Sequence, residues 1–160
     1  MIRVFLISFF LSFNLAADNS IEALEDTLYK FWEARNNQDF EMIFFYESKI
    51  GAITGSSSEN YFYEDPPPDL KSVVDYYSLV ESNVKPSNIK IIQLSEKVYL
   101  TLYYLTGSYK YSNGKVNTEY KTRSSNIWFY EDGGFKLYYK NFTNLKKDLE
   151  PTDIIAYPMD

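Results

Sequence analysis

The sequence contains no cysteine and no histidine. Without cysteine there are no disulfides and no thiol nucleophiles, and without histidine the Ser-His-Asp and Cys-His arrangements and nearly all zinc, copper and haem sites are excluded. A chain of 160 residues can still bury a core large enough to fold by packing alone. Only carboxylates could hold a metal ion, and none cluster at ligand spacing, so we expect neither a metal nor a cofactor.

Basic residues are scarce relative to acidic ones. The formal charge of the whole chain is -6; removal of the first 17 residues, argued below, takes Arg3 and no acid, which leaves 15 basic against 22 acidic side chains, or -7. An acidic domain repels phosphate backbones, so we expect no nucleic-acid partner. Aromatic residues make up 19% of the chain, with 16 Tyr and 12 Phe, and this content suits the wide faces of a β-sheet.

Residues 1–17 have the features of a secretory signal peptide. Arg3 supplies a short positive region, residues 4–13 form an apolar run, and Leu15-Ala16-Ala17 provides a small-residue cleavage site. The apolar run is too short to span a bilayer comfortably. We therefore expect cleavage near Ala17, a periplasmic or secreted mature protein, and no membrane contact after cleavage. The alternative is an uncleaved anchor or a buried first helix.

Helical periodicity dominates the start of the mature chain. An amphipathic helix is predicted over 19–36, with Asn19 and Glu22 resembling a capping pair. The residues that recur at helical spacing are Ile21, Leu24, Leu28, Phe31, Trp32 and Arg35. Asp39 is placed to cap a short second helix over 40–46.

The middle of the chain is irregular before helical periodicity returns. Short strands at 50–54 and 61–63 are only weakly supported. Asp69 is placed to cap a third helix, which Lys85-Pro86-Ser87 is expected to end. The apolar stripe of this third helix is Leu70, Val73, Tyr77 and Val80.

From Asn88 onward the apolar period changes from that of a helix to that of a strand. The predicted strands are 89–95, 97–111, 115–130 and 134–143. Asn113-Gly114 and Asp132-Gly133-Gly134 have the chemistry of hairpin turns, and Gly107 indicates a bulge or a bend inside a long strand. Helices followed by an antiparallel meander predict an α+β domain with the helices on one face of the sheet.

This layout resembles the nuclear-transport-factor-2-like superfamily, which includes SnoaL-like cyclases, ketosteroid isomerases and kinase association domains. The resemblance rests on FWEARNNQD at 31–39, RSSNIW at 123–128, the glycine pair at 133–134 and FKLYYKNFT at 135–143. It implies a cystatin-like cone, in which a curved four-to-six-stranded antiparallel sheet wraps around three N-terminal helices. The domain would span 18–145, with a C-terminal tail at 146–160.

The resemblance also implies a pocket. Many members carry an Arg and a Thr on the penultimate strand and two His on the last, all facing the interior. The matching positions here are Arg123, Ser125, Tyr139 and Asn141, and the loss of both His rules out His-dependent activity. We expect these four side chains to converge in an aromatic-lined pocket beneath the first helix, near Tyr29 and Trp32. The alternative is a filled core with Arg123 paired to an acid.

Two functions from different classes remain open. One is a non-catalytic domain that binds a small apolar or anionic organic ligand, or a partner protein. The other is a SnoaL-like isomerase, cyclase or hydro-lyase that acts on a carbonyl compound through a carboxylate and a Tyr. The acids that remain for the enzyme are Glu33, Asp39 and Glu119, which fit a solvated helix position, a helix cap and a cross-strand ion pair better.

Two observations distinguish these functions. A buried carboxylate within hydrogen-bond reach of a Tyr in the cavity would favour the enzyme. A large aromatic patch on the outer sheet face would favour binding or a homodimer through that face. One face of a single strand carries Tyr99, Tyr103, Tyr109 and Tyr111. These rings could form such a patch, or the domain's own helices could cover them.

Overall fold

Three helices and one six-stranded sheet make up the part of the chain that the structure, a computed structural model, describes, residues 19–56 and 61–145. The signal peptide expected at 1–17 and the tail expected at 146–160 lie outside these residues. In chain order the elements are α1 (Ile21–Asn37), α2 (Phe40–Tyr46), β1 (Ala52–Gly55), β2 (Phe62–Asp65), α3 (Leu70–Tyr77), β3 (Val80–Ser95), β4 (Val98–Tyr111), β5 (Val116–Glu131) and β6 (Gly134–Asn144). The α+β class predicted from the sequence is confirmed.

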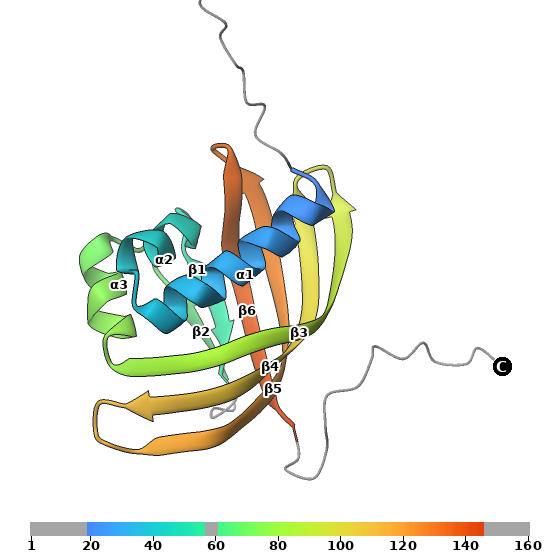
Figure 1. Cartoon of the computed structure of the whole chain (residues 1–160). Helices are drawn as coiled ribbons and strands as arrows, with labels where there is room; N and C mark the ends of the chain where they lie inside the picture. Colours follow the sequence, from blue (N-terminus) through green and yellow to red (C-terminus); the bar gives the residue numbers. More distant parts are fainter. Residues whose placement is uncertain (1–18, 57–60, 146–160) are drawn as a thin grey trace, which may run out of the picture.

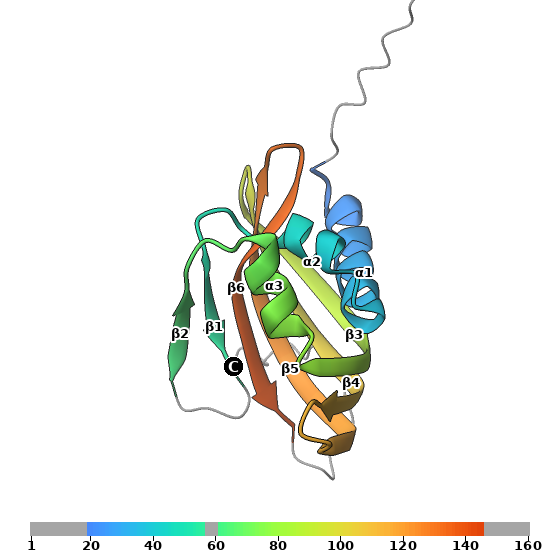
Figure 2. The same cartoon turned by 90° about the vertical axis from the view of Figure 1, so that its left-hand side faces the viewer.

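The sheet has the strand order β2-β1-β6-β5-β4-β3. All neighbours are antiparallel except β1 and β6, which run parallel, so the sheet is mixed. The long strands curve around α1, which lies across their concave face (Figure 1). Figure 2 shows the end of the molecule that carries α3 and the β1–β2 hairpin.

Helix α1 forms where the periodicity predicts it, but its cap differs. Ser20, not Asn19, is the N-cap, and its side chain accepts a hydrogen bond from the backbone N–H of Ala23. At the other end Gln38 adopts a left-handed conformation. Asp39 then caps α2 as expected, because its carboxylate accepts from the backbone N–H of Met42 at 3.1 Å.

The third helix ends earlier than the sequence predicts. Asp69 caps it through a capping box with Ser72, but α3 stops at Tyr77, and Val80 already belongs to β3. Pro86 therefore lies inside a strand instead of ending a helix. An edge strand tolerates proline because one side of its backbone has no neighbour to bond, and β3 is the edge strand opposite β2.

The turn glycines adopt the conformations that the sequence predicts. Gly114 has φ +82° in the β4–β5 turn, and Asp132 and Gly133 both have positive φ in the β5–β6 turn. Gly107 has φ +147° and marks a bulge in the β4–β5 pairing. A left-handed backbone at these points explains why glycine is needed there.

The core lies between α1 and the concave face of the sheet. Its members include Leu24, Leu28, Phe31, Trp32, Tyr99, Tyr103, Leu105, Trp128, Phe135 and Leu137. Tyr99, Tyr103 and Tyr109 are thus buried beneath the helices, so they form no outer patch. No helix among the described residues is long and apolar enough to cross a membrane.

Candidate functional site

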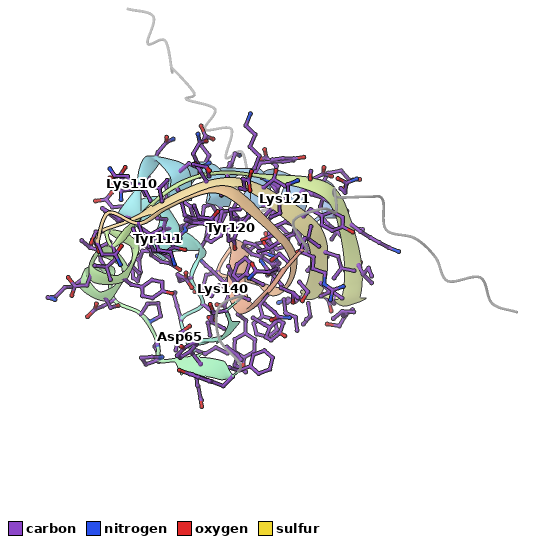
Figure 3. The ribbon with its side chains drawn as sticks, turned by 90° about the horizontal axis from the view of Figure 1, so that it is seen from below. Asp65, Lys110, Tyr111, Tyr120, Lys121 and Lys140 are labelled. Atoms are coloured by element: carbon purple, nitrogen blue, oxygen red, sulfur yellow. The ribbon has the colours of Figure 1, made fainter. Side chains whose placement is uncertain are left out.

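A cavity of about 530 Å³ opens at the end of the cone where α3 and the β1–β2 hairpin lie; we call it the interior cavity. Many of the residues that line it are aromatic: Phe31, Trp32, Tyr76, Tyr77, Tyr109, Tyr111, Tyr120 and Phe142. In the view from below, Tyr111 and Tyr120 lie on one side of the opening and Asp65 on the other, with Lys140 between them (Figure 3).

A buried polar cluster borders this cavity. The ammonium of Lys140 contacts both carboxylate oxygens of Glu47, at 3.2 and 3.1 Å. The hydroxyl of Tyr77 donates to the same carboxylate at 2.6 Å. The side chains of Lys140 and Glu47 are only 11% and 6% exposed, so both charges are largely removed from water. Each of these buried polar groups therefore has a hydrogen-bond partner, as buried polar groups in native proteins generally do.

Three different elements bring this cluster together. Glu47 directly follows α2 and forms a parallel bridge with Leu137 of β6. Lys140 lies three residues further along β6, opposite the buried Asn126 of β5. Tyr77 is the last residue of α3. The cluster therefore ties the small helices to the sheet at the cavity wall.

Burial and the neighbouring charges change the pKa of Tyr77 and the pKa of Lys140. Burial of the Tyr77 phenol and its proximity to the Glu47 carboxylate raise the pKa of Tyr77 above its ordinary value. Burial alone would lower the pKa of Lys140, but Tyr77 and Glu47 outweigh it and raise that pKa above its ordinary value. At neutral pH Lys140 is therefore an ammonium and Tyr77 a neutral phenol.

The residues expected to form the pocket do not all face the interior cavity. Trp32 lines it, whereas Tyr29 is 47% exposed. The remaining four, Arg123, Ser125, Tyr139 and Asn141, lie on the opposite, outer face of the sheet. The expectation that they face the interior is wrong in register: on β5 the buried side chains are Thr122, Ser124, Asn126 and Trp128. A shift of one residue moves every side chain to the other face.

A bulge explains why Tyr139 on the last strand faces outward. The register between β5 and β6 shifts between Ile127 and Trp128, which pair with Tyr139 and Leu137. Leu137 faces the core, but beyond the bulge Lys140 takes the inward position and Tyr139 points outward. The alternation that assigned residues 135–143 to a single face breaks at this point.

Three of the four residues nevertheless share a hollow. Arg123, Ser125 and Asn141 line a depression of about 410 Å³ on the outer face, together with Tyr104 and Thr143; we call it the outer depression. No hydrogen bond or ion pair links the side chain of Arg123 to the described residues. Whether these residues bind a ligand stays a prediction.

The acids considered for catalysis are not part of the cavity. Asp39 is the cap of α2, and both Glu33 and Glu119 are exposed. No group of three or more metal-ligating side chains occurs among residues 19–56 and 61–145.

Sequence patterns do not identify Glu47, Lys140 and Tyr77 as a cluster. Helical spacing places Tyr77 on the apolar stripe of its helix, but nothing in this spacing indicates its partner. Glu47 carries no pattern signal, because it sits between two short elements. Lys140 could be found only with the bulge in the register of β6, which no turn residue announces.

Comparison with solved structures identifies the fold. It is the nuclear-transport-factor-2-like, cystatin-like α+β fold. A nuclear-transport-factor-2-like protein from Cytophaga hutchinsonii superposes with a TM-score of 0.63 at 16% identity, covering 80% of this chain and 100% of that one. A ketosteroid isomerase-like protein from Erwinia carotovora atroseptica gives 0.62 at 11%, covering 81% and 98%.

A third structure is named as a candidate dehydratase of the same fold family, from Streptomyces avermitilis. Its TM-score is 0.63 at 12% identity, with 79% of this chain and 96% of that one covered. No family model and no curated protein matches the sequence. At these identities the likeness shows the fold alone.

Proposed function

We propose that this domain binds a small organic molecule in the interior cavity without converting it. The observation that carries the proposal is the cavity itself: about 530 Å³, walled by aromatic rings and bordered by a few buried polar groups. Small-molecule sites in proteins have this form, with apolar walls for affinity and a few fixed polar groups for orientation. The aromatic rings of the wall come from α1, α3, β4, β5 and β6, and residues of β1, β2, β3 and the loops beside them complete the lining.

The polar border contains a buried carboxylate beside a Tyr, the arrangement that would favour an enzyme, but this carboxylate is already engaged. Lys140 engages both oxygens of Glu47, and Tyr77 already donates to one of them. A substrate proton would have to compete with these donors for the carboxylate. The cluster is thus better suited to hold a ligand's polar group than to move a proton.

A larger side chain that fills the interior cavity tests whether a ligand binds there. Val80 lines it, and Val80→Trp adds an indole there. Leu94→Trp, on the same strand but at a 54% exposed position outside the cavity, is the matched control. Native mass spectrometry of the purified proteins should show a small-molecule adduct on the parent and on Leu94→Trp, and none on Val80→Trp. Equal adducts on all three would overturn the proposal.

A second function is supported by one specific contact. The 2.6 Å hydrogen bond from Tyr77 to the buried Glu47 is the carboxylate–tyrosine pair that an isomerase, cyclase or hydro-lyase of a carbonyl compound would need. Two proteins of the same fold are named for such chemistry, one ketosteroid isomerase-like and one a candidate dehydratase.

Proton abstraction can be measured without knowing the product. If Glu47 removes a proton next to a carbonyl, the small molecule that co-purifies should gain deuterium when the protein is incubated in heavy water. Glu47→Gln should bind the molecule and fail to exchange it. An exchange rate equal to that of the free molecule supports the binding function instead.

We also propose that the mature protein works outside the cytoplasm. The proposal rests on residues 1–17 alone, with their apolar run and small-residue ending. N-terminal sequencing of protein from the extracytoplasmic fraction should begin close to Asp18. Material that retains Met1 and stays in the cytoplasm would contradict it.

A further inference from the structure

Arg35 is a second cation on the wall of the interior cavity. It lies in the last turn of α1, on the same stripe as Phe31 and Trp32. Its guanidinium carbon sits 3.7 Å from the centre of the Tyr77 ring, in a cation–π contact. A permanently charged side chain on the apolar stripe of a helix is unusual, because such positions are normally filled by core residues.

The guanidinium has no acceptor among the described residues. Arg carries five N–H donors, yet no hydrogen bond or ion pair of this side chain occurs in residues 19–56 and 61–145. The nearby acids are already engaged: Glu47 accepts from Lys140 and Tyr77, and Asp65 accepts from Thr54 at 2.7 Å. Lys140 differs from Arg35 in that its charge is matched by Glu47.

The backbone around Arg35 is fixed. Its carbonyl accepts from the hydroxyl of Ser82 at 3.1 Å. The next residue, Asn36, exchanges two hydrogen bonds with the backbone of Val84, one through each end of its amide, at 2.8 and 3.0 Å. These bonds clamp α1 to β3 and fix the base of the Arg35 side chain, and the cation–π contact with Tyr77 places the guanidinium at the cavity wall, which lowers the entropic cost of binding.

We propose that Arg35 anchors a carboxylate or similar planar oxyanion of the molecule bound in the interior cavity; this rests on the function proposed above. The planar fork of a guanidinium matches a carboxylate with two parallel hydrogen bonds. The rings of Tyr109 and Phe142 line the same cavity and are placed to enclose the apolar part of the ligand. The ligand class is therefore an organic acid with a flat or apolar body.

Two probes of equal shape and different charge test the assignment. Naphthoate carries a carboxylate, and naphthamide replaces it with a neutral amide. Calorimetric titration of the full mature chain should show naphthoate binding about tenfold or more tightly than naphthamide, as expected for charge-assisted hydrogen bonds. Arg35→Met should abolish this preference while retaining naphthamide binding. Arg123→Met, which removes a guanidinium from the outer depression, should keep the preference.

Arg35→Lys separates a folding defect from a binding defect. This variant keeps the charge but loses the planar fork, so it should retain only part of the preference for naphthoate over naphthamide. Equal binding of the two probes by the parent, or a preference that survives in Arg35→Met, overturns the role of Arg35 and leaves the cavity as a binding site. If Arg123→Met loses the preference for naphthoate instead, the anion site lies on the outer face. Failure of both probes to bind overturns the assignment to a flat organic acid, while the adduct comparison between Val80→Trp and Leu94→Trp still decides the proposed function.

Discussion

At the scale of single residues, the ion pair of Lys140 and Glu47 is the most consequential contact. Removal of one partner from a buried pair leaves the other charge without compensation, which is more costly than loss of the pair as a whole. The same chain offers an exposed counterpart in Lys49 and Asp132, whose side chains are 71% and 63% exposed. Comparison of the two pairs isolates the effect of burial.

We expect Lys140→Met to lower the free energy of unfolding by about 3–5 kcal/mol, because it leaves Glu47 charged and buried. Glu47→Gln combined with Lys140→Met should recover much of this loss, since the amide can still accept from Tyr77. Lys49→Met should leave stability essentially unchanged. Urea denaturation measures all three, and equal effects of Lys140→Met and Lys49→Met would show that the buried pair is not formed.

Buried tyrosines make a second residue-level prediction, for alkaline pH. Burial raises the pKa of Tyr103 to about 12, and burial also raises the pKa of Tyr77 and Tyr109. A phenol whose pKa is higher in the folded state stabilises the fold fully below its unfolded value, near pH 10, and loses that contribution as the pH rises further. Lys140, whose pKa is also raised, acts in the same direction.

The urea midpoint should therefore be flat between about pH 7 and 9 and should fall steeply above about pH 10. Tyr109→Phe should reduce the steepness without loss at neutral pH, because no hydrogen bond to the Tyr109 hydroxyl occurs among the described residues. Ultraviolet absorbance of the phenolates follows the ionisation directly. Stability that holds or rises at alkaline pH would contradict the burial of these rings.

At the scale of elements, sequence patterns predict the helices and hairpins better than the faces of the strands. Asp39 and Asp69 mark helix starts, and Gly114 and Gly133 mark turns, because each signal is a local chemical requirement. The inward face of β5 is different. Its buried residues, Thr122, Ser124 and Asn126, are as polar as their outward neighbours, so alternation alone does not select the face.

The polar side chains on the inner face of β5 have hydrogen-bond partners on other elements. Tyr103 accepts hydrogen bonds from the indole N–H of Trp32 at 3.1 Å and from the Asn126 amide at 2.9 Å, and Ser124 donates to that amide at 2.8 Å. Asn126 is buried to satisfy these partners, and only the fold brings them together. Helical spacing in the sequence places Arg35 on the apolar stripe of α1. It gives no sign that the guanidinium lacks an acidic partner.

The irregular pairing of β4 and β5 beside Gly107 gives a prediction at this scale. A Cβ at Gly107 would lie 2.1 Å from the carbonyl oxygen of Asn83 on β3, whereas a Cβ at Gly114 would meet nothing within 4 Å. Gly114→Ala should cost about 1 kcal/mol, from backbone strain alone. Gly107→Ala should cost at least about 2 kcal/mol, because strain and a backbone clash add. Thermal melts compare them, and equal costs would show that β3 does not approach β4 closely at Gly107.

At the scale of the whole molecule, the two sides of the sheet have different characters. The inner side holds the core and the interior cavity, and the outer side holds the outer depression around Arg123. The homodimer expected through the outer face stays a proposal. The tyrosines of β4 do not support it, because Tyr99, Tyr103 and Tyr109 are buried on the inner side of the sheet. Light scattering of the purified protein measures the oligomeric state.

The central claim is that the ligand occupies the interior cavity and not the outer depression. The chain contains two Trp residues, and only Trp32 lines the cavity; Trp128 donates to Thr101 inside the core. Their indole N–H groups, together with the backbone amides of Arg123 and Asn141 on the outer face, form a set of local probes for nuclear magnetic resonance.

The measurement is a titration of nitrogen-15-labelled protein with naphthoate. Binding in the interior cavity should shift the indole N–H signal of Trp32 and the backbone amides at the end of α1, with smaller changes at Trp128. The amides of Arg123 and Asn141 should stay in place. Shifts confined to Arg123, Ser125 and Asn141, with Trp32 unchanged, would place the ligand on the outer face and contradict the account.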